Sequence, residues 1–308
     1  MDATKVSGQG CIVCERIGAI GRVTVDPASG LAETSDWLRW REAYDRWIAD
    51  PNVYGGLIRM GPSAGSTGLR DIEAWLGRLR KSPDAAIPEL AEFYRLIWTI
   101  DRFSKPTVAM LDGEVNWLDF CLVRHGTHKV VGEDFRLNLA CMASWFPDAG
   151  ATWWLSRLPG SEGQPIAAHS LIIDGVEALR LGLATHRIAR DLFDGIERAY
   201  AEADPIDQVL DGLAVAASGS VSSRMSAAGA QAAVSPAVDG MVALLFAEAR
   251  ESTLRETLER DFAVALAMAG QREPFPTGLA ADRYRALLSR AKSELALKPP
   301  PAVPEALG

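Results

Sequence analysis

Apolar side chains in the first half of the chain recur at two kinds of spacing, which predict short strands alternating with amphipathic helices. In residues 36–50, Trp37, Trp40, Tyr44 and Trp47 follow at three- and four-residue intervals, the pattern of a helix with one buried face. Short β-rich runs bounded by Gly and Pro predict strands. The predicted strands cover residues 11–16, 21–25, 53–60, 107–111, 129–131 and 135–139, and the predicted helices cover residues 36–50, 69–80 and 87–102.

Beyond residue 151 the chain is rich in alanine and its pattern is mostly helical. Strands that alternate with helices early, followed by helices alone, predict an α/β protein with a helical C-terminal region. We predict a core over residues 1–200, a helical region over 201–297 and a proline-rich tail over 298–308.

Composition and charge argue against several functional classes, nucleic-acid binding and membrane proteins among them. The chain has 308 residues, of which 48% are hydrophobic and 23% charged, which is typical of a globular protein. Forty acidic against 32 basic residues leave a net charge of −8, which argues against a nucleic-acid partner. No apolar run approaches the ~18 residues of a membrane span, and residues 1–7 lack signal-peptide features. We therefore expect a cytoplasmic protein without a membrane partner.

Cysteine and histidine give no support for a metal. Cys11 and Cys14 have a metal-like spacing, but no second pair lies at zinc-finger distance, so we expect no metal site. His125 and His128 are three residues apart, without an acidic residue at a nearby helical spacing.

Two stretches carry candidate chemistry. Gly61-Pro62-Ser63-Ala64-Gly65 matches the G-x-S-x-G nucleophile pattern, with Asp148 and His186 downstream. We prefer to interpret it as a glycine-rich turn that offers backbone N–H groups to an oxyanion. Asp148 lies in the turn Phe146-Pro147-Asp148-Ala149-Gly150, where it could act as a general base, orient a water or cap the next helix.

Several short motifs occur in a recognisable order. They are residues 53–60 with the glycine loop and Leu69-Arg70-Asp71-Ile72; Phe93-Tyr94-Arg95-Leu96, Lys105-Pro106-Thr107 and Asp112-Gly113; His125-Gly126; Phe146-Pro147-Asp148 with Leu155-Ser156-Arg157-Leu158-Pro159-Gly160; and Gly182-Leu183-Ala184-Thr185-His186. From about residue 10 to 290, the chain resembles the crotonase (enoyl-CoA hydratase/isomerase) superfamily. The Phe-Pro-Asp and Gly-x-Ala-Thr-His forms are most similar to its 3-hydroxyisobutyryl-CoA hydrolase branch.

The resemblance implies a ββα superhelix core and hydrolysis of an acyl-CoA thioester. It implies that Asp148 positions water or substrate, and that N–H groups near Gly68 and Leu118 hold the thioester oxygen. The substrate-binding set then comprises Gly68, Trp117, Leu118, Asp119 and His125. Coenzyme A would enter only as part of the substrate, no other cofactor is implied, and a homo-oligomer is compatible with the resemblance.

The chain departs from the family where the chemistry lies. Trp117-Leu118-Asp119 replaces a glycine triplet, so bulky side chains crowd the expected carbonyl position, and any positive φ there would be costly. The catalytic glutamate of the family falls at residue 140 or 141, where no carboxylate stands, and Cys121 replaces the first glutamate of the hydratases.

These departures leave two alternatives to an acyl-CoA hydrolase open. One is a hydrolase of β-diketone C–C bonds on the same fold, using His125 and Asp148 without CoA. The other is a non-catalytic, degenerate paralogue whose pocket is filled by Trp117 and Leu118.

Overall fold

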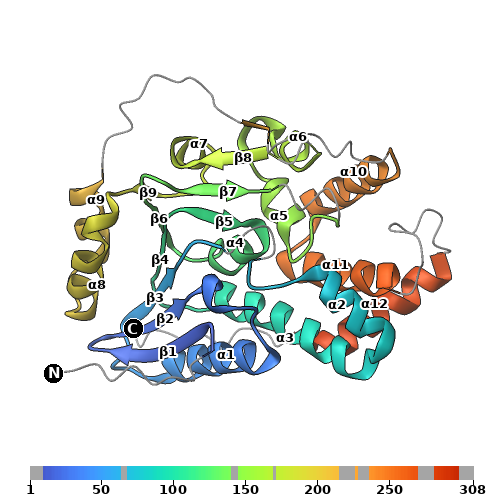
Figure 1. The fold of residues 1–308 in the computed structure, drawn as a ribbon, viewed down its shortest axis with the longest axis horizontal. Helices are drawn as coiled ribbons and strands as arrows, with labels where there is room; N and C mark the ends of the chain where they lie inside the picture. The colour runs from blue at the N-terminus through green and yellow to red at the C-terminus, as the bar shows by residue number, and fades with distance from the viewer. Residues whose placement is uncertain are drawn as a thin grey trace, which may run out of the picture.

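The computed structural model describes residues 10–63, 68–139, 145–168, 171–214, 226–227, 236–269 and 281–297 (Figure 1). A six-stranded sheet has the order β1-β2-β3-β4-β6-β9. β1 and β2 form an antiparallel hairpin closed by the pair Ile17 and Ile20, and the strands from β2 to β9 are parallel. The strands are β1 (Ile12–Ile17), β2 (Ile20–Val25), β3 (Gly55–Met60), β4 (Thr107–Leu111), β6 (His128–Val131) and β9 (His186–Arg187).

A second sheet has the order β10-β8-β7-β5. Its strands are β5 (Glu114–Asn116), β7 (Arg136–Asn138), β8 (Leu171–Asp174) and β10 (Ser226–Ala227). The helices are α1 (Thr34–Ala49), α2 (Ile72–Lys81), α3 (Pro83–Asp101), α4 (Trp117–Val123), α5 (Ala151–Leu155), α6 (Gly163–Ala168), α7 (Gly175–Arg180), α8 (Phe193–Ala201), α9 (Ile206–Leu213), α10 (Pro236–Glu251), α11 (Leu254–Ala269) and α12 (Ala281–Leu295).

The six-stranded sheet separates two hydrophobic cores. The smaller core joins Leu57, Met110 and Val130 of the sheet to Ile196 of α8 and Leu210 of α9. The larger core contains side chains of α1 to α5 and of α10, α11 and α12. Figure 1 shows α8 and α9 at one side of the molecule, with α2 and α10 to α12 at the other. β4 is buried on both faces, as its run of apolar residues requires.

The six predicted strands and three predicted helices all occur; β4 has the predicted ends, and the other elements differ from the prediction by at most four residues at either end. Beyond residue 151 the described chain is mostly helical, as predicted, but three short strands that were not predicted, β8, β9 and β10, also occur there. These strands are only two to four residues long, too short to show a period in the sequence. None of the described helices is long and apolar enough to cross a membrane. The predicted tail, residues 298–308, lies outside the described part of the chain.

Candidate active site

The glycine loop after β3 lies against the first turn of α4 through Ser63 and Asp119. The Ser63 hydroxyl donates to Asp119 Oδ2 at 2.7 Å and accepts the Asn116 N–H at 2.9 Å. The Leu69 N–H donates to Asp119 Oδ1 at 3.0 Å. One carboxylate therefore joins the two loops that the sequence predicted as the oxyanion loops.

Asp119 is 1% exposed and packs directly against the backbone of Gly68. Gly68 has φ +57, and a Cβ there would lie 2.3 Å from Asp119 Oδ2, so only glycine fits. Burial raises the pKa of Asp119 to about 6, although the hydrogen bonds from Ser63 and Leu69 lower it. A carboxylate thus occupies the space beside Gly68 where the sequence predicted a substrate carbonyl.

Trp117 and Leu118 adopt helical geometry, which avoids the strain of a positive φ. Asn116 is the N-cap of α4, with φ −69 and ψ 147, and its side-chain oxygen accepts the Leu118 N–H at 2.9 Å. Both side chains are buried in the larger core. The Leu118 N–H therefore already has an acceptor inside the protein, and its part in an oxyanion hole stays a prediction.

Asp148 is completely buried in the turn that leads into α5. Oδ1 accepts hydrogen bonds from the Tyr94 hydroxyl and the Ala149 N–H, and Oδ2 accepts the Trp145 indole N–H at 2.9 Å. Burial raises the pKa of Asp148, whereas Arg70 and the three donors lower it. Because a carboxylate has about four acceptor positions, one position on Oδ2 remains open among the described residues.

Arg70 faces this open position. Its Nη1 lies 3.7 Å from Asp148 Oδ2, too far for a hydrogen bond, and the residue is 6% exposed. Nη1 and Nη2 have no hydrogen-bond partner in the described structure. The guanidinium stacks over the rings of Trp75 and Phe93, with its Cζ 5.1 and 5.2 Å from the ring centroids. Buried N–H groups beside an open acceptor site are suited to a polar ligand atom or a water.

The helical C-terminal region adds a third acid. Asp261 of α11 accepts the Gly150 N–H on Oδ2 at 2.9 Å, and its Oδ1 makes no hydrogen bond among the described residues but lies 3.6 Å from Arg260 Nη2. Burial raises the pKa of Asp261 to about 7, with Arg260 lowering it and Asp148 raising it further.

The thiol of Cys121 in α4 is influenced by all three buried acids. The pKa of its thiol is raised by burial first, and then by the negative charges of Asp148, Asp261 and Asp119. The three buried carboxylates therefore act electrostatically on the position that a glutamate occupies in the hydratases the chain resembles. The other glutamate position, residue 140 or 141, lies outside the described residues.

The remaining candidates lie in other surroundings. His125 is buried, with Nδ1 3.2 Å from Asp101, and burial lowers its pKa. No described contact joins it to Asp148, as the diketone alternative would require. His186 lies 3.2 Å from Asp211, so the described contacts do not assemble a Ser63–His186–Asp148 triad. Across the described ranges, no group of three histidine, cysteine or acidic side chains could hold a metal ion.

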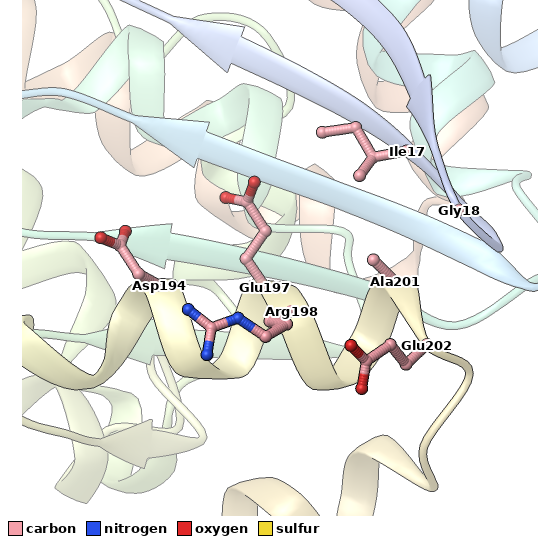
Figure 2. Close-up of a pocket in the computed structure, with 7 residues that line it drawn as sticks. All are labelled: Ile17, Gly18, Asp194, Glu197, Arg198, Ala201 and Glu202. Atoms are coloured by element: carbon pink, nitrogen blue, oxygen red, sulfur yellow. The ribbon is translucent and has the colours of Figure 1, made fainter. Parts of the chain in front are cut away.

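An open groove of about 420 Å³ lies between the β1–β2 turn and α8, and Figure 2 draws the residues that line it. Ile17 and Gly18 form one wall, and Asp194, Glu197 and Arg198 lie along the helix. Glu197 is already paired with Arg22 and Arg59, so its charge is neutralised within the protein. Because α8 belongs to the smaller core, this groove is separate from the three buried acids.

Sequence reasoning found Asp148 and Asp119 but missed Arg70, Tyr94 and Asp261. Arg70 and Tyr94 belong to sequence motifs of the family, but no neighbouring residue in the sequence indicates their contact with Asp148. Asp261 did leave a signal, since it stands at the start of the apolar run Phe262-Ala263-Val264-Ala265-Leu266 inside a helix. Its contact with Gly150 spans 111 residues and could not be read from spacing.

Comparison with known proteins agrees with this architecture. The sequence profile of the enoyl-CoA hydratase/isomerase family matches residues 37–242. A carnitinyl-CoA dehydratase from Mycobacterium thermoresistibile superposes with a TM-score of 0.71 at 23% identity, covering 97% of this chain and 95% of the other. An enoyl-CoA hydratase from Rhodobacter sphaeroides gives a TM-score of 0.70 at 18% identity, covering 91% and 97%. The predicted α/β crotonase-like fold with a helical C-terminal region is therefore confirmed.

The relatives found by sequence comparison include proteins named as hydrolases and proteins named as ribosomal components. The 3-hydroxyisobutyryl-CoA hydrolase-like protein 1, mitochondrial, of Arabidopsis thaliana is 30% identical over 59% of this chain and 44% of its own length. The small ribosomal subunit protein mS47 of Schizosaccharomyces pombe is 31% identical over 40% of this chain and 30% of its own length. The chain thus matches less than half the length of either relative. Since the plant relative is named as mitochondrial, the cytoplasmic location expected for this chain stays a prediction.

Proposed function

The chain belongs to the enoyl-CoA hydratase/isomerase family, and on that premise we propose that it hydrolyses an acyl-CoA thioester at the site around Asp148. The observation that carries the proposal is the pairing of Asp148 with Arg70. Asp148 offers one open acceptor position, and beside it Nη1 and Nη2 of Arg70 are buried and make no hydrogen bond to any described residue. A water or a substrate hydroxyl bound between them would satisfy both groups.

The environment of Asp148 suits a residue that positions a proton. Tyr94, Trp145 and the Ala149 N–H hold the carboxylate in one orientation, and burial raises its pKa toward the working range of a general base. Perturbed carboxylates gather preferentially at functional sites, and Asp119, Asp148 and Asp261 all have raised pKa values. The similarity to a protein named as 3-hydroxyisobutyryl-CoA hydrolase-like suggests the acyl group to test first.

A non-catalytic role is the second candidate, and Asp119 is the observation that favours it. An oxyanion formed beside Gly68 would meet the ionised carboxylate of Asp119. Two unit charges 4 Å apart repel by about 4 kcal/mol at an effective dielectric constant of about 20. That energy corresponds to roughly a thousandfold loss of rate. The similarity of this chain to a protein named as the small ribosomal subunit protein mS47 also favours this role.

Release of free CoA from 3-hydroxyisobutyryl-CoA, followed with a thiol reagent, tests the proposal. We expect turnover by the wild-type chain and a loss of ~10²–10⁴ in rate for Asp148→Asn. Arg70→Met should lower turnover as well, whereas the exposed Asp207→Asn should not. Circular dichroism of each variant checks the fold.

Failure of the wild type to release CoA would overturn the proposed hydrolase. Quenching of tryptophan fluorescence then separates the remaining candidates. Saturable binding of the CoA ester without turnover would support the non-catalytic paralogue. Cleavage of a free β-diketone without any response to CoA esters would support the C–C hydrolase.

A further inference from the structure

Ser63 lies at the end of β3 in a turn held by the backbone. Its own N–H donates to the Glu114 carbonyl at 2.7 Å, which fixes the main chain of the turn against β5. The residue is half-buried, whereas its partner Asp119 is sealed from solvent. The Ser63 hydroxyl donates to Asp119 Oδ2 at 2.7 Å. The Ser63 hydroxyl is therefore held by a buried carboxylate, in a residue that is itself only partly buried.

Asp119 has the features of a base rather than of a simple structural acceptor. The Leu69 N–H donates to Oδ1 at 3.0 Å, which leaves Oδ2 directed at Ser63. Burial raises the pKa of Asp119 to about 6, so this carboxylate is a stronger base than an exposed aspartate and is mostly ionised at neutral pH. A nucleophile in contact with a base that a third group orients is the arrangement of covalent hydrolases.

We infer that Ser63 is a nucleophile and Asp119 its general base, in a dyad that attacks the carbonyl of an activated ester or thioester. The inference rests on the proposed hydrolase and names its attacking atom. Ser63 Oγ bonds to the carbonyl carbon while its proton passes to Asp119 Oδ2. The C–S or C–O bond of the substrate then breaks, and the leaving thiol or alcohol takes that proton. Water hydrolyses the acyl-Ser63 ester with Asp119 accepting its proton, which returns to Ser63 as the carboxylic acid leaves.

This step also removes the charge conflict at the oxyanion loops. Asp119 is negative while the site waits for substrate, and it becomes neutral when it accepts the Ser63 proton. The repulsion of about 4 kcal/mol estimated above therefore disappears as negative charge develops on the carbonyl oxygen. The Asn116 N–H, 2.9 Å from Ser63 Oγ, stabilises negative charge on that oxygen during proton transfer.

A fluorophosphonate probe, which phosphonylates activated serines, tests the dyad without assuming a substrate. We expect one adduct on the intact chain, mapped by peptide mass spectrometry to Ser63. Ser63→Ala, which removes one oxygen, should abolish the adduct, and Asp119→Asn should slow labelling by ~10²–10⁴. Ser156→Ala is the matched control, because Ser156 is half-buried and its hydroxyl donates to a backbone carbonyl, that of Trp153, instead of to a carboxylate. In the wild type the labelling rate should rise through about pH 6 as Asp119 ionises, and in Asp119→Asn this rise should be missing.

An unlabelled wild-type chain, or equal labelling in Ser63→Ala, would overturn the dyad. Release of CoA from 3-hydroxyisobutyryl-CoA distinguishes this failure from that of the proposed hydrolase. If Ser63→Ala keeps the wild-type rate while Asp148→Asn loses it, the hydrolase stands and the dyad is wrong. If Ser63 is labelled but no CoA is released, the dyad stands and the acyl-CoA hydrolase is wrong.

Discussion

At the scale of single residues, the site is notable for acids that are buried without full compensation. Asp261 is the clearest example, since among the described residues its Oδ1 makes no hydrogen bond and lies 3.6 Å from Arg260 Nη2, while its Oδ2 accepts the Gly150 N–H. Its pKa of about 7 lies above that of an unfolded aspartate, so between these values the folded chain holds a proton that the unfolded chain has released. The contribution of this bound proton to the free energy of unfolding is complete below about pH 4, and it is lost as the pH rises through 7.

Replacing Asp261 by asparagine should therefore change the pH dependence of stability. The amide keeps an oxygen for the Gly150 N–H but cannot ionise. The free energy of unfolding of Asp261→Asn, taken relative to that of the wild type, should be higher at pH 8 than at pH 5 by on the order of 2 kcal/mol. Urea unfolding at both pH values measures this difference. The exposed Asp282→Asn is the control, and it should change the free energy of unfolding equally at pH 5 and at pH 8. An equal change at the two pH values for Asp261→Asn would contradict the prediction.

Some residues of the candidate site can be predicted from their neighbours in the sequence, whereas others depend on contacts between distant segments. Asp148 could be predicted because the proline and the glycine that make its turn lie within two residues of it in the sequence. The partners Arg70 and Tyr94 could not, because they reach Asp148 from a loop and a helix that precede it by more than fifty residues. Asp119 was expected near the substrate by resemblance, but its contacts with Ser63 and Leu69 depend on how the two loops meet.

At the scale of elements, α4 explains how a glycine triplet can be replaced by Trp-Leu-Asp. Asn116 begins a helix at once, so Trp117 and Leu118 need no positive φ and their side chains point into the larger core. The sequence indicated the crowding correctly, but it could not show that a helix start relieves it. The same limit explains the missed β5, because three residues, Glu114–Asn116, are too few to show an alternating pattern.

The N-cap of α4 should therefore contribute measurably to stability. Asn116→Ala removes the oxygen that accepts the Leu118 N–H, and we expect a loss of about 1 kcal/mol in the free energy of unfolding. Asn116→Ser keeps a capping oxygen and should recover most of this loss. Urea denaturation of the three chains provides the comparison. Equal losses in both variants would mean that the cap itself contributes nothing and that another contact of Asn116 is responsible.

At the scale of the whole molecule, the C-terminal helices are part of the same core as the sheet. The larger core runs from Cys11, just before β1, to Leu297 after α12. Phe262 of α11 packs edge to face on Tyr94, with ring centroids 5.4 Å apart, and Arg95 of α3 donates to the carbonyls of Glu294 and Leu295. The site depends on this packing, because Asp261 reaches Gly150 from the same helix as Phe262. The predicted boundary at residue 200 therefore crosses a shared core, and whether it separates two folding units stays open to experiment.

Two optical probes can decide whether these parts unfold together. All nine tryptophans lie between residues 37 and 154, so their fluorescence reports on the first part, whereas far-ultraviolet circular dichroism also reports on α8 to α12. Because one core joins the parts, we expect the two urea transitions to coincide. Leu258→Ala in α11, which should cost roughly 2–5 kcal/mol at this fully buried position, should move both transitions to lower urea by the same amount. A dichroism transition that precedes the fluorescence transition, and that alone responds to Leu258→Ala, would mean that the C-terminal helices fold as a separate unit. In that case Asp261 would belong to a unit able to leave the site without unfolding the residues around Asp148.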